Sequence, residues 1–203
     1  MINVEKLRHL GPFTQQAHKL NDGSHIVHFY DQAKTLIDAV CDFVVPSLTR
    51  GEGIILIATP ENRRAIKKAL ERRSIDIAMT RATGQLLIMD AFETLEKFMV
   101  NGMPQAMKFE NVMGGVLEKM QSKFPKVRAY GEMVNILWHQ DNIEATIQLE
   151  GYWNLLAKSY QFSLFCGYHV TEENKIKNGL SLNEVCCTHS HVICPAGDLK
   201  VIC

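Results

Sequence analysis

The sequence lacks the features of several common protein classes. Among its 203 residues, no apolar run approaches the roughly 18 residues of a membrane-spanning helix, and the N-terminus has no signal-peptide hydrophobic region. We therefore expect a soluble, cytoplasmic protein with no membrane partner. Neither sign of charge is in excess, because 22 Lys and Arg residues balance 22 Asp and Glu residues. This balance argues against direct nucleic-acid binding, which normally uses a basic excess.

The usual catalytic and nucleotide-binding motifs are also missing. There is no nucleophile elbow, HExxH pair or Rossmann glycine set. The turn after the first expected strand carries Lys34 and Thr35 where a phosphate-binding loop has its Lys-Ser/Thr pair. Such a loop needs glycines so that backbone N–H groups can surround the phosphates, and this turn holds Phe29 and Tyr30 instead. We predict no working phosphate-binding loop, no cofactor and no catalytic residue.

Short apolar runs alternate with amphipathic stretches along most of the chain. This alternation predicts an α/β fold with a mostly parallel central sheet flanked by helices. Residues 1–24 are predicted to form an N-terminal arm, and residues 25–203 a single domain. The expected strands are residues 25–30, 53–59, 85–89, 127–130 and 162–168, with a last extended piece at 189–193.

Local signals bound the expected helices. Asp31, Thr59 and Asp90 are expected to cap helix N-termini, because their side chains can accept hydrogen bonds from free N–H groups. Pro46, followed by Gly51, is expected to end the first helix, and Asn101-Gly102 a later one. Residues 104–121 are predicted to form one longer amphipathic helix.

Ligands of open parallel sheets bind outside the carboxyl ends of the strands. That rule nominates Phe29, Tyr30, Thr59, Asp90, Glu132 and residues 167–169. This mixed aromatic, polar and acidic set suits a small molecule better than a polyphosphate. Glu132 has two open interpretations, a ligand contact or a structural hydrogen bond at the strand end.

A second candidate group lies on a later helix, where Glu150 and Asn154 share one side at a spacing of four residues. A carboxylate among the apolar positions there must be paired, because burying it alone is costly. The pair therefore forms either a helix-packing hydrogen bond or a ligand contact.

The C-terminal part carries possible zinc or copper ligands, although their spacing matches no standard zinc module. His189 and His191 would share one face of a strand, whereas His25 and His28 would point to opposite faces. The alternative is that these histidines form local hydrogen bonds or line a pocket. The candidate metal ligands are Cys186, Cys187, His189, His191 and Cys194.

One helix is strongly basic. It follows Pro60, and we interpret it as either a solvated face or a partner-docking surface. Its cations are Arg63, Arg64, Lys67, Lys68, Arg72 and Arg73.

Several stretches taken in order resemble one family. The chain resembles the MEDS domain, a methanogen and methylotroph sensory domain, over about residues 25–194. The matching stretches are HIVHFYD at 25–31, RGEGIILIATPENRRAI at 50–66, LLIMDAFETLEKFMVNGMP at 86–104, VRAYGEMVNILWHQDN at 127–142, IQLEGYWNLL at 147–156, FSLFCGY at 162–168 and CTHSHVI at 187–193.

The resemblance implies a three-layer RecA/KaiC-like sandwich that lacks a functional phosphate-binding loop. It also implies a non-catalytic sensory module that binds a small molecule, hydrocarbon derivatives included, and regulates a separate histidine kinase or transcriptional regulator. A homo-oligomer is a further expectation. The alternatives are a residual ATPase-like or phosphotransfer protein, and a metal or redox sensor using the C-terminal Cys and His residues. Ligand-binding positions carried over or nominated above are His25, Phe29, Tyr30, Thr59, Asp90, Glu132, Trp138, Glu150, Trp153, Asn154, Cys166, Tyr168, His189 and His191.

Overall fold

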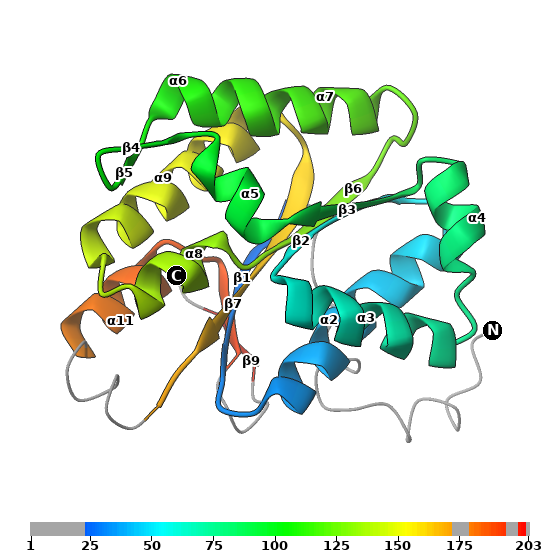
Figure 1. The fold of residues 1–203 in the computed structure, drawn as a ribbon, viewed down its shortest axis with the longest axis horizontal. Coiled ribbons are helices and arrows are strands. Elements are labelled where there is room, and N and C mark those ends of the chain that lie inside the picture. The colour runs from blue at the N-terminus through cyan, green and yellow to red at the C-terminus, as the bar shows by residue number, and fades with distance from the viewer. Residues whose placement is uncertain (1–22, 172–178, 194–198, 202–203) are drawn as a thin grey trace.

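A computed structural model describes residues 23–171, 179–193 and 199–201 of the chain, so the predicted N-terminal arm lies almost wholly outside the described residues. A seven-stranded sheet forms the centre, in the order β3-β2-β6-β7-β1-β8-β9 (Figure 1). Neighbouring strands are parallel except for β9, which runs antiparallel to β8. The strands are β1 (His25–Tyr30), β2 (Gly53–Ala58), β3 (Leu86–Asp90), β6 (Val127–Gly131), β7 (Phe162–His169), β8 (His191–Ile193) and β9 (Leu199–Val201).

Helices cover both faces of the sheet and create two separate apolar cores (Figure 1). One face is covered by α2 (Ala33–Thr49) and α3 (Pro60–Arg72), with α4 (Ile77–Ala82) beside them. This three-layer arrangement confirms the predicted α/β fold. The opposite face is covered by α5 (Ala91–Glu96), α6 (Ala106–Phe109), α7 (Gly115–Gln121), α8 (Met133–His139), α9 (Ile143–Ser159) and α11 (Gly179–Cys187). Within the described ranges, no helix combines the length and apolar character needed to cross a bilayer.

The central strands are buried on both faces, which explains their unbroken apolar sequence. Every residue of β2 is buried, and its neighbours β3 and β6 pair with it in parallel register. Glycine suits position 53, the first residue of β2, because a Cβ atom there would lie only 2.8 Å from the side chain of Met120 on α7. The apolar run beginning at residue 53 therefore predicted this strand correctly.

Of the expected helix ends, Gly51 was correct for α2, whereas Pro46 and Asn101-Gly102 were wrong. α2 continues through Pro46 to Thr49, because a proline so near the end removes only one helical hydrogen bond. Gly51, whose φ is +77°, then redirects the chain. Asn101-Gly102 does not end a helix, since α5 already ends at Glu96.

Asn101-Gly102 instead forms the turn of a small hairpin between β4 (Met99–Val100) and β5 (Met103–Pro104). The φ angles of Asn101 and Gly102 are +50° and +79°, as a two-residue type I′ turn requires. An Asn-Gly pair is compatible with both structures, and the apolar residues on either side favour the hairpin.

The helix starts were predicted with mixed success. Asp90 caps α5 as predicted, because its carboxylate accepts hydrogen bonds from two N–H groups of the first turn. Thr59 occupies the N-cap position of α3, but its side chain accepts no capping hydrogen bond. Asp31 is not a cap, because α2 begins one residue later with Gln32 as N-cap. Lys34 and Thr35 make contacts within α2: Lys34 pairs with Asp38 at 2.8 Å, and the Thr35 hydroxyl donates to the Gln32 carbonyl.

The predicted helix at 104–121 begins two residues late, at Ala106, and contains a π-helical segment at Glu110–Gly114 between α6 and α7. Gly114 lies against Tyr160, whose hydroxyl would be 3.2 Å from an added Cβ atom. A π segment widens the helix locally, and such segments occur often at functional sites.

His28 on β1 gives the fold a measurable pH dependence. Its ring lies 5.9 Å from that of Phe165, and its Nδ1 has no hydrogen-bond partner among the described residues. Burial lowers the pKa of His28 to about 4, against the opposing effect of the Asp31 charge. The unfolded chain takes up this proton near pH 6.5 and the folded chain only near pH 4, so stability falls as the pH drops between these values.

We predict that His28→Leu reduces this loss of stability. Between pH 7 and pH 5, the free energy of unfolding of the wild-type chain should fall by about 2 kcal/mol more than that of His28→Leu, as measured by urea denaturation. Ile26→Val on the same strand is the control, and should cost about 1 kcal/mol at both pH values. An equal pH dependence in wild type and His28→Leu would contradict the prediction.

Candidate functional site

The candidate site is a cluster of polar side chains buried between the sheet and α9. His25 is the first residue of β1, and Cys166 lies on β7 beside it. Because the strands are parallel with His25 opposite Leu164, His25 and Cys166 project from the same face of the sheet. α9 crosses this face and contributes Glu150 and Asn154, which are one helical turn apart.

His189 completes the cluster from the bend between α11 and β8. The Ser190 N–H donates to the His25 carbonyl at 2.8 Å, and the His25 N–H donates to Ser190 Oγ at 2.9 Å. Asn154 Nδ2 donates to the Thr188 carbonyl at 2.8 Å. These bonds hold the bend against β1 and α9, and the centroids of the His25 and His189 rings lie 4.0 Å apart.

Glu150 is the centre of the cluster and is fully buried. Its Oε1 accepts a hydrogen bond from the Tyr168 hydroxyl at 2.6 Å and lies 3.4 Å from His189 Nε2. Its Oε2 lies 3.3 Å from His25 Nε2 and accepts a weak hydrogen bond from the Cys166 thiol at 3.7 Å. An unpaired buried carboxylate would be very costly, so the donors Tyr168 and Cys166 help Glu150 to occupy the core, with both imidazole Nε2 atoms close by.

The hydrogen bonds around the cluster define which imidazole nitrogens carry hydrogen. Asn154 donates through Nδ2, so its Oδ1 accepts from His25 Nδ1 at 2.8 Å. Nδ1 of His189 lies 2.6 Å from the Val185 carbonyl, which can only accept. Both rings therefore carry hydrogen on Nδ1, and both direct Nε2 at the carboxylate of Glu150.

Electrostatics and burial shift the titrating groups of the cluster in different directions. Burial would raise the pKa of Glu150, but the nearby His189 and His25 outweigh it and hold that pKa below its usual value. Burial, followed by the effect of His189, lowers the pKa of His25. Burial, reinforced by Glu150, raises the pKa values of Cys166 and Tyr168. At neutral pH the cluster therefore holds an ionised carboxylate beside a neutral thiol and a neutral phenol.

Aromatic side chains from the predicted set form an apolar wall around these polar groups. The rings of Phe29 and Trp138 lie 5.7 and 5.8 Å from that of Tyr168. Trp153, on the same helix as Glu150, packs edge-on against Phe109 at 4.9 Å. The polar cluster is therefore surrounded by apolar side chains in the layer between the sheet and α9.

Glu132, which was nominated at a strand end, is held by hydrogen bonds from within the domain. Its carboxylate accepts hydrogen bonds from the Thr59 N–H at 2.8 Å, Asn62 Nδ2 at 3.0 Å and the Tyr130 hydroxyl at 2.7 Å. Burial raises the pKa of Glu132, and these hydrogen bonds oppose that effect. The geometry favours the structural interpretation of Glu132, which joins the ends of β2 and β6.

Two other nominated strand-end residues also have partners within the fold. Asp90 forms an ion pair with Arg63 of α3 at 2.7 Å in addition to capping α5. Tyr30 is buried with its ring 5.3 Å from that of His169. The cluster around Glu150 lies mostly elsewhere, near the amino end of β1, and only Tyr168 among the residues nominated by the strand-end rule bonds to it.

The candidate metal ligands of the C-terminal part do not gather in one place. Of the candidates that the structure describes, only His189 joins the cluster; His191, the first residue of β8, is half-buried and contacts Ser190 Oγ. Cys186 is half-buried on α11 and Cys187 is exposed. The expectation that His189 and His191 share a strand face was wrong, because β8 begins only at His191. Cys194 lies outside the described residues.

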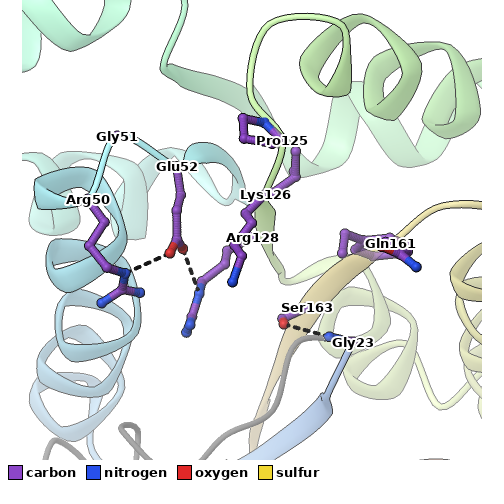
Figure 2. A pocket seen from close by; sticks show the side chains of 11 residues that line it. Gly23, Arg50, Gly51, Glu52, Pro125, Lys126, Arg128, Gln161 and Ser163 are labelled. Atoms are coloured by element: carbon purple, nitrogen blue, oxygen red, sulfur yellow. Dashed lines mark hydrogen bonds and ion pairs between the residues drawn. The ribbon is translucent and has the colours of Figure 1, made fainter.

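A charged cavity of roughly 410 Å³ lies at the amino ends of β2, β6 and β7 (Figure 2). Glu52 lies between Arg50 at 2.7 Å and Arg128 at 3.2 Å, as Figure 2 shows. Burial opposes ionisation, but Arg50 and Arg128 lower the pKa of Glu52. These ion pairs connect the end of α2 to β6, and no local pattern in the sequence predicts them.

The three-layer sheet and helix arrangement defines an α/β protein of the RecA/KaiC-like class, and solved structures agree. The chain is similar to an uncharacterised protein, PH0321 from Pyrococcus horikoshii, solved with an unknown peptide, at a TM-score of 0.67 and 13% identity over 98% of this chain and 89% of that one. It is also similar to KaiC-like protein PH0186 from P. horikoshii OT3, at a TM-score of 0.57 and 11% identity over 86% and 73%. These identities show the fold alone.

The family is shown by the sequence comparison. The chain belongs to the MEDS family, the MEthanogen/methylotroph, DcmR Sensory domain, whose model matches residues 24–190. The resemblance predicted from the motifs is therefore confirmed, and the chain is a sensory domain. A comparison with curated proteins gave no significant match.

We predict that Glu132 contributes to stability through its three hydrogen bonds. In Glu132→Gln, the amide nitrogen cannot accept a bond, so the free energy of unfolding should fall by about 2 to 3 kcal/mol in urea denaturation. Glu93→Gln, at an exposed position on α5, is the control and should change it by less than about 0.5 kcal/mol. Unaltered stability of Glu132→Gln would show that the carboxylate does not join the strand ends.

Proposed function

We propose that this sensory domain is a non-catalytic module that binds a small molecule at the cluster around Glu150. A separate histidine kinase or transcriptional regulator then reads the change through protein–protein contact. The observation that carries the proposal is that the segment 179–193, whose strand β8 pairs with β1, also contacts the cluster directly through the bend at 188–190. Any change at the cluster therefore acts directly on the position of that segment.

The cluster has the chemistry expected of a small-molecule site. Ligand sites are mostly apolar, with a few convergent polar groups that orient the ligand. Here Phe29, Trp138 and Trp153 supply the apolar wall, and the carboxylate of Glu150 is the polar centre. A small hydrocarbon derivative with one polar group would match both parts.

Burial of the cluster makes binding and movement interdependent. His25, Glu150 and His189 are buried, so a ligand reaches them only when the bend at 188–190 moves away from β1. A ligand shifts a conformational equilibrium only by as much as its affinities for the two states differ. A ligand that contacts Glu150 after His189 has moved would satisfy this condition, and α11 would carry the change to the surface.

We predict that Tyr168→Phe loosens the segment 179–193. The change removes the 2.6 Å hydrogen bond to Glu150 and weakens the contacts that hold His189. Amide hydrogen exchange in the bend at 188–190 should accelerate about tenfold, for a local cost of about 1.4 kcal/mol. Hydrogen exchange with mass spectrometry of the full chain measures this directly.

Tyr152→Phe is the matched control. The Tyr152 hydroxyl, also on α9, contacts Gln148 and the Pro104 carbonyl instead of the cluster, so its loss should leave exchange at 188–190 unchanged. Equal exchange in wild type, Tyr168→Phe and Tyr152→Phe would show that the cluster does not control the segment.

A groove of roughly 710 Å³ beside β3 is the surface we assign to the protein partner. β3 is the edge strand of the described sheet, since it pairs only with β2 there. An edge strand offers free N–H and C=O groups to an added strand, and Leu87 on this edge is 37% exposed. The apolar lining comes from Leu86, Leu87, Ile88, Val112, Val116 and Met120.

The charge of the groove indicates what kind of segment it would take. Arg81, Lys119 and Lys123 lie along its lining, so an extended acidic segment of the partner is the complementary occupant. The peptide in the similar structure PH0321 supports a peptide as occupant of this fold. The basic helix α3 is a less complete surface, because Arg63 and Arg73 form ion pairs with Asp90 and Asp42 within the domain.

We predict that a fluorescein-labelled peptide of alternating Glu and Val binds the chain, and that a Lys and Val peptide does not. Fluorescence anisotropy should show about tenfold weaker binding to the double variant Lys119→Glu/Lys123→Glu, because like charges then oppose each other. Lys158→Glu, an exposed change on α9, should have little effect. Equal affinity for both peptides, or for both variants, would remove the groove from the proposal.

A further inference from the structure

We propose that His25, Glu150, Cys166 and His189 form a binding site for a divalent transition-metal ion of the zinc type. The metal site uses the same cluster as the proposed function, and in that respect alone it rests on that proposal. It differs from the metal site considered from the sequence, which combined His189 with C-terminal cysteines. Three observations support the site: the spacing of the ligand atoms, the orientation of the two imidazole rings and the lack of a hydrogen-bond partner for His189 Nε2 among the described residues.

Four metal-ligating side chains converge at distances close to those of a tetrahedral metal site. One ligand atom from each of the four residues lies within 4.8 Å of those of the other three. From His25 Nε2, the Glu150 carboxylate is 3.3 Å away and Cys166 Sγ 3.5 Å; the other carboxylate oxygen lies 3.4 Å from His189 Nε2. Ligand atoms around tetrahedral zinc lie about 3.3 to 3.6 Å apart, given the usual metal–ligand distances. The residue types are also those that zinc prefers.

The rings are already oriented as metal ligands. A histidine that binds a metal through one nitrogen usually donates the other N–H to a carbonyl or carboxylate, which fixes the ring. His25 Nδ1 donates to the side-chain carbonyl of Asn154, and His189 Nδ1 donates to the Val185 carbonyl. Both Nε2 atoms thus remain for a metal, and Asn154 is a positioning residue for His25.

His189 Nε2 supplies independent support. It is buried and has no hydrogen-bond partner of good geometry among the described residues, although Glu150 lies 3.4 Å away. Buried polar atoms normally have a partner, and an exception in a native structure points to an unseen one. An ion between His189 and Glu150 would meet this requirement.

Charge also balances when the ion binds. The Cys166 thiol would lose its proton to solvent and bind as thiolate, while Glu150 binds as carboxylate and both histidines as neutral rings. One divalent cation then neutralises two buried anions. The Tyr168 hydroxyl would keep its hydrogen bond to Glu150 Oε1 and orient the carboxylate.

Cobalt(II) is the probe that tests the site, because a thiolate ligand produces a charge-transfer band and a tetrahedral site produces visible d–d bands. The full chain, purified without an affinity tag and stripped with EDTA, should bind one Co²⁺ with both signatures, and Zn²⁺ should displace it. Cys166→Ser should abolish the thiolate band and weaken binding at least about hundredfold. Asn154→Ala should weaken binding about 10- to 100-fold while keeping the thiolate band.

Cys186→Ser on α11 and Cys41→Ser on α2 are the controls, and both should retain the full spectrum. If circular dichroism shows that Cys166→Ser does not fold, the cobalt spectra of Asn154→Ala and the two controls still test the site. No tetrahedral cobalt spectrum, or a thiolate band lost in Cys186→Ser, would overturn the proposal. Metal binding without any change in exchange at 188–190 would uphold the metal site and refute the sensing role. Faster exchange at 188–190 in Tyr168→Phe, without cobalt binding by the wild-type chain, would uphold the sensing role and refute the metal site.

Discussion

A carboxylate inside an apolar core is the constraint on which this domain depends. Glu150 is fully buried on α9, and a buried charge needs close partners to be tolerated. Those partners come from the start of β1, from β7 and from the bend before β8, so one side chain ties together elements from both ends of the described chain. The same requirement makes the cluster sensitive, because a change in any partner alters the balance around Glu150. The proposed function therefore places the responsive site in the core of the domain.

The architecture was largely predictable because it follows from local patterns. The continuous apolar run of β2 can only be a strand buried on both faces, and the alternation of such runs with amphipathic stretches defines a parallel sheet. Local signals with two meanings gave the errors. Asn101-Gly102 suits both a helix end and a hairpin turn, and Pro46 near a helix end is tolerated when the buried residues after it hold the last turn.

The members of the site were predictable individually, but their association was not. Glu150 and Asn154 were paired correctly as residues that share a helix side, because four-residue spacing is a local property. That His25 meets Cys166 depends on the register between β1 and β7, and that it meets His189 depends on where the bend after α11 folds back. Sequence spacing carries neither fact. It therefore grouped His189 with His191 and the cysteines of the C-terminal part, which the fold separates.

The central claim is that both histidines hold hydrogen on Nδ1 and direct Nε2 at Glu150. Long-range ¹H–¹⁵N correlation spectra of protein labelled at histidine with ¹⁵N measure this most directly, before and after addition of Zn²⁺. The account predicts that Nδ1 of His25 and His189 carries hydrogen in both states, and that zinc shifts the Nε2 signals of these two rings. Hydrogen on Nε2 with a bare Nδ1 in either ring would contradict it.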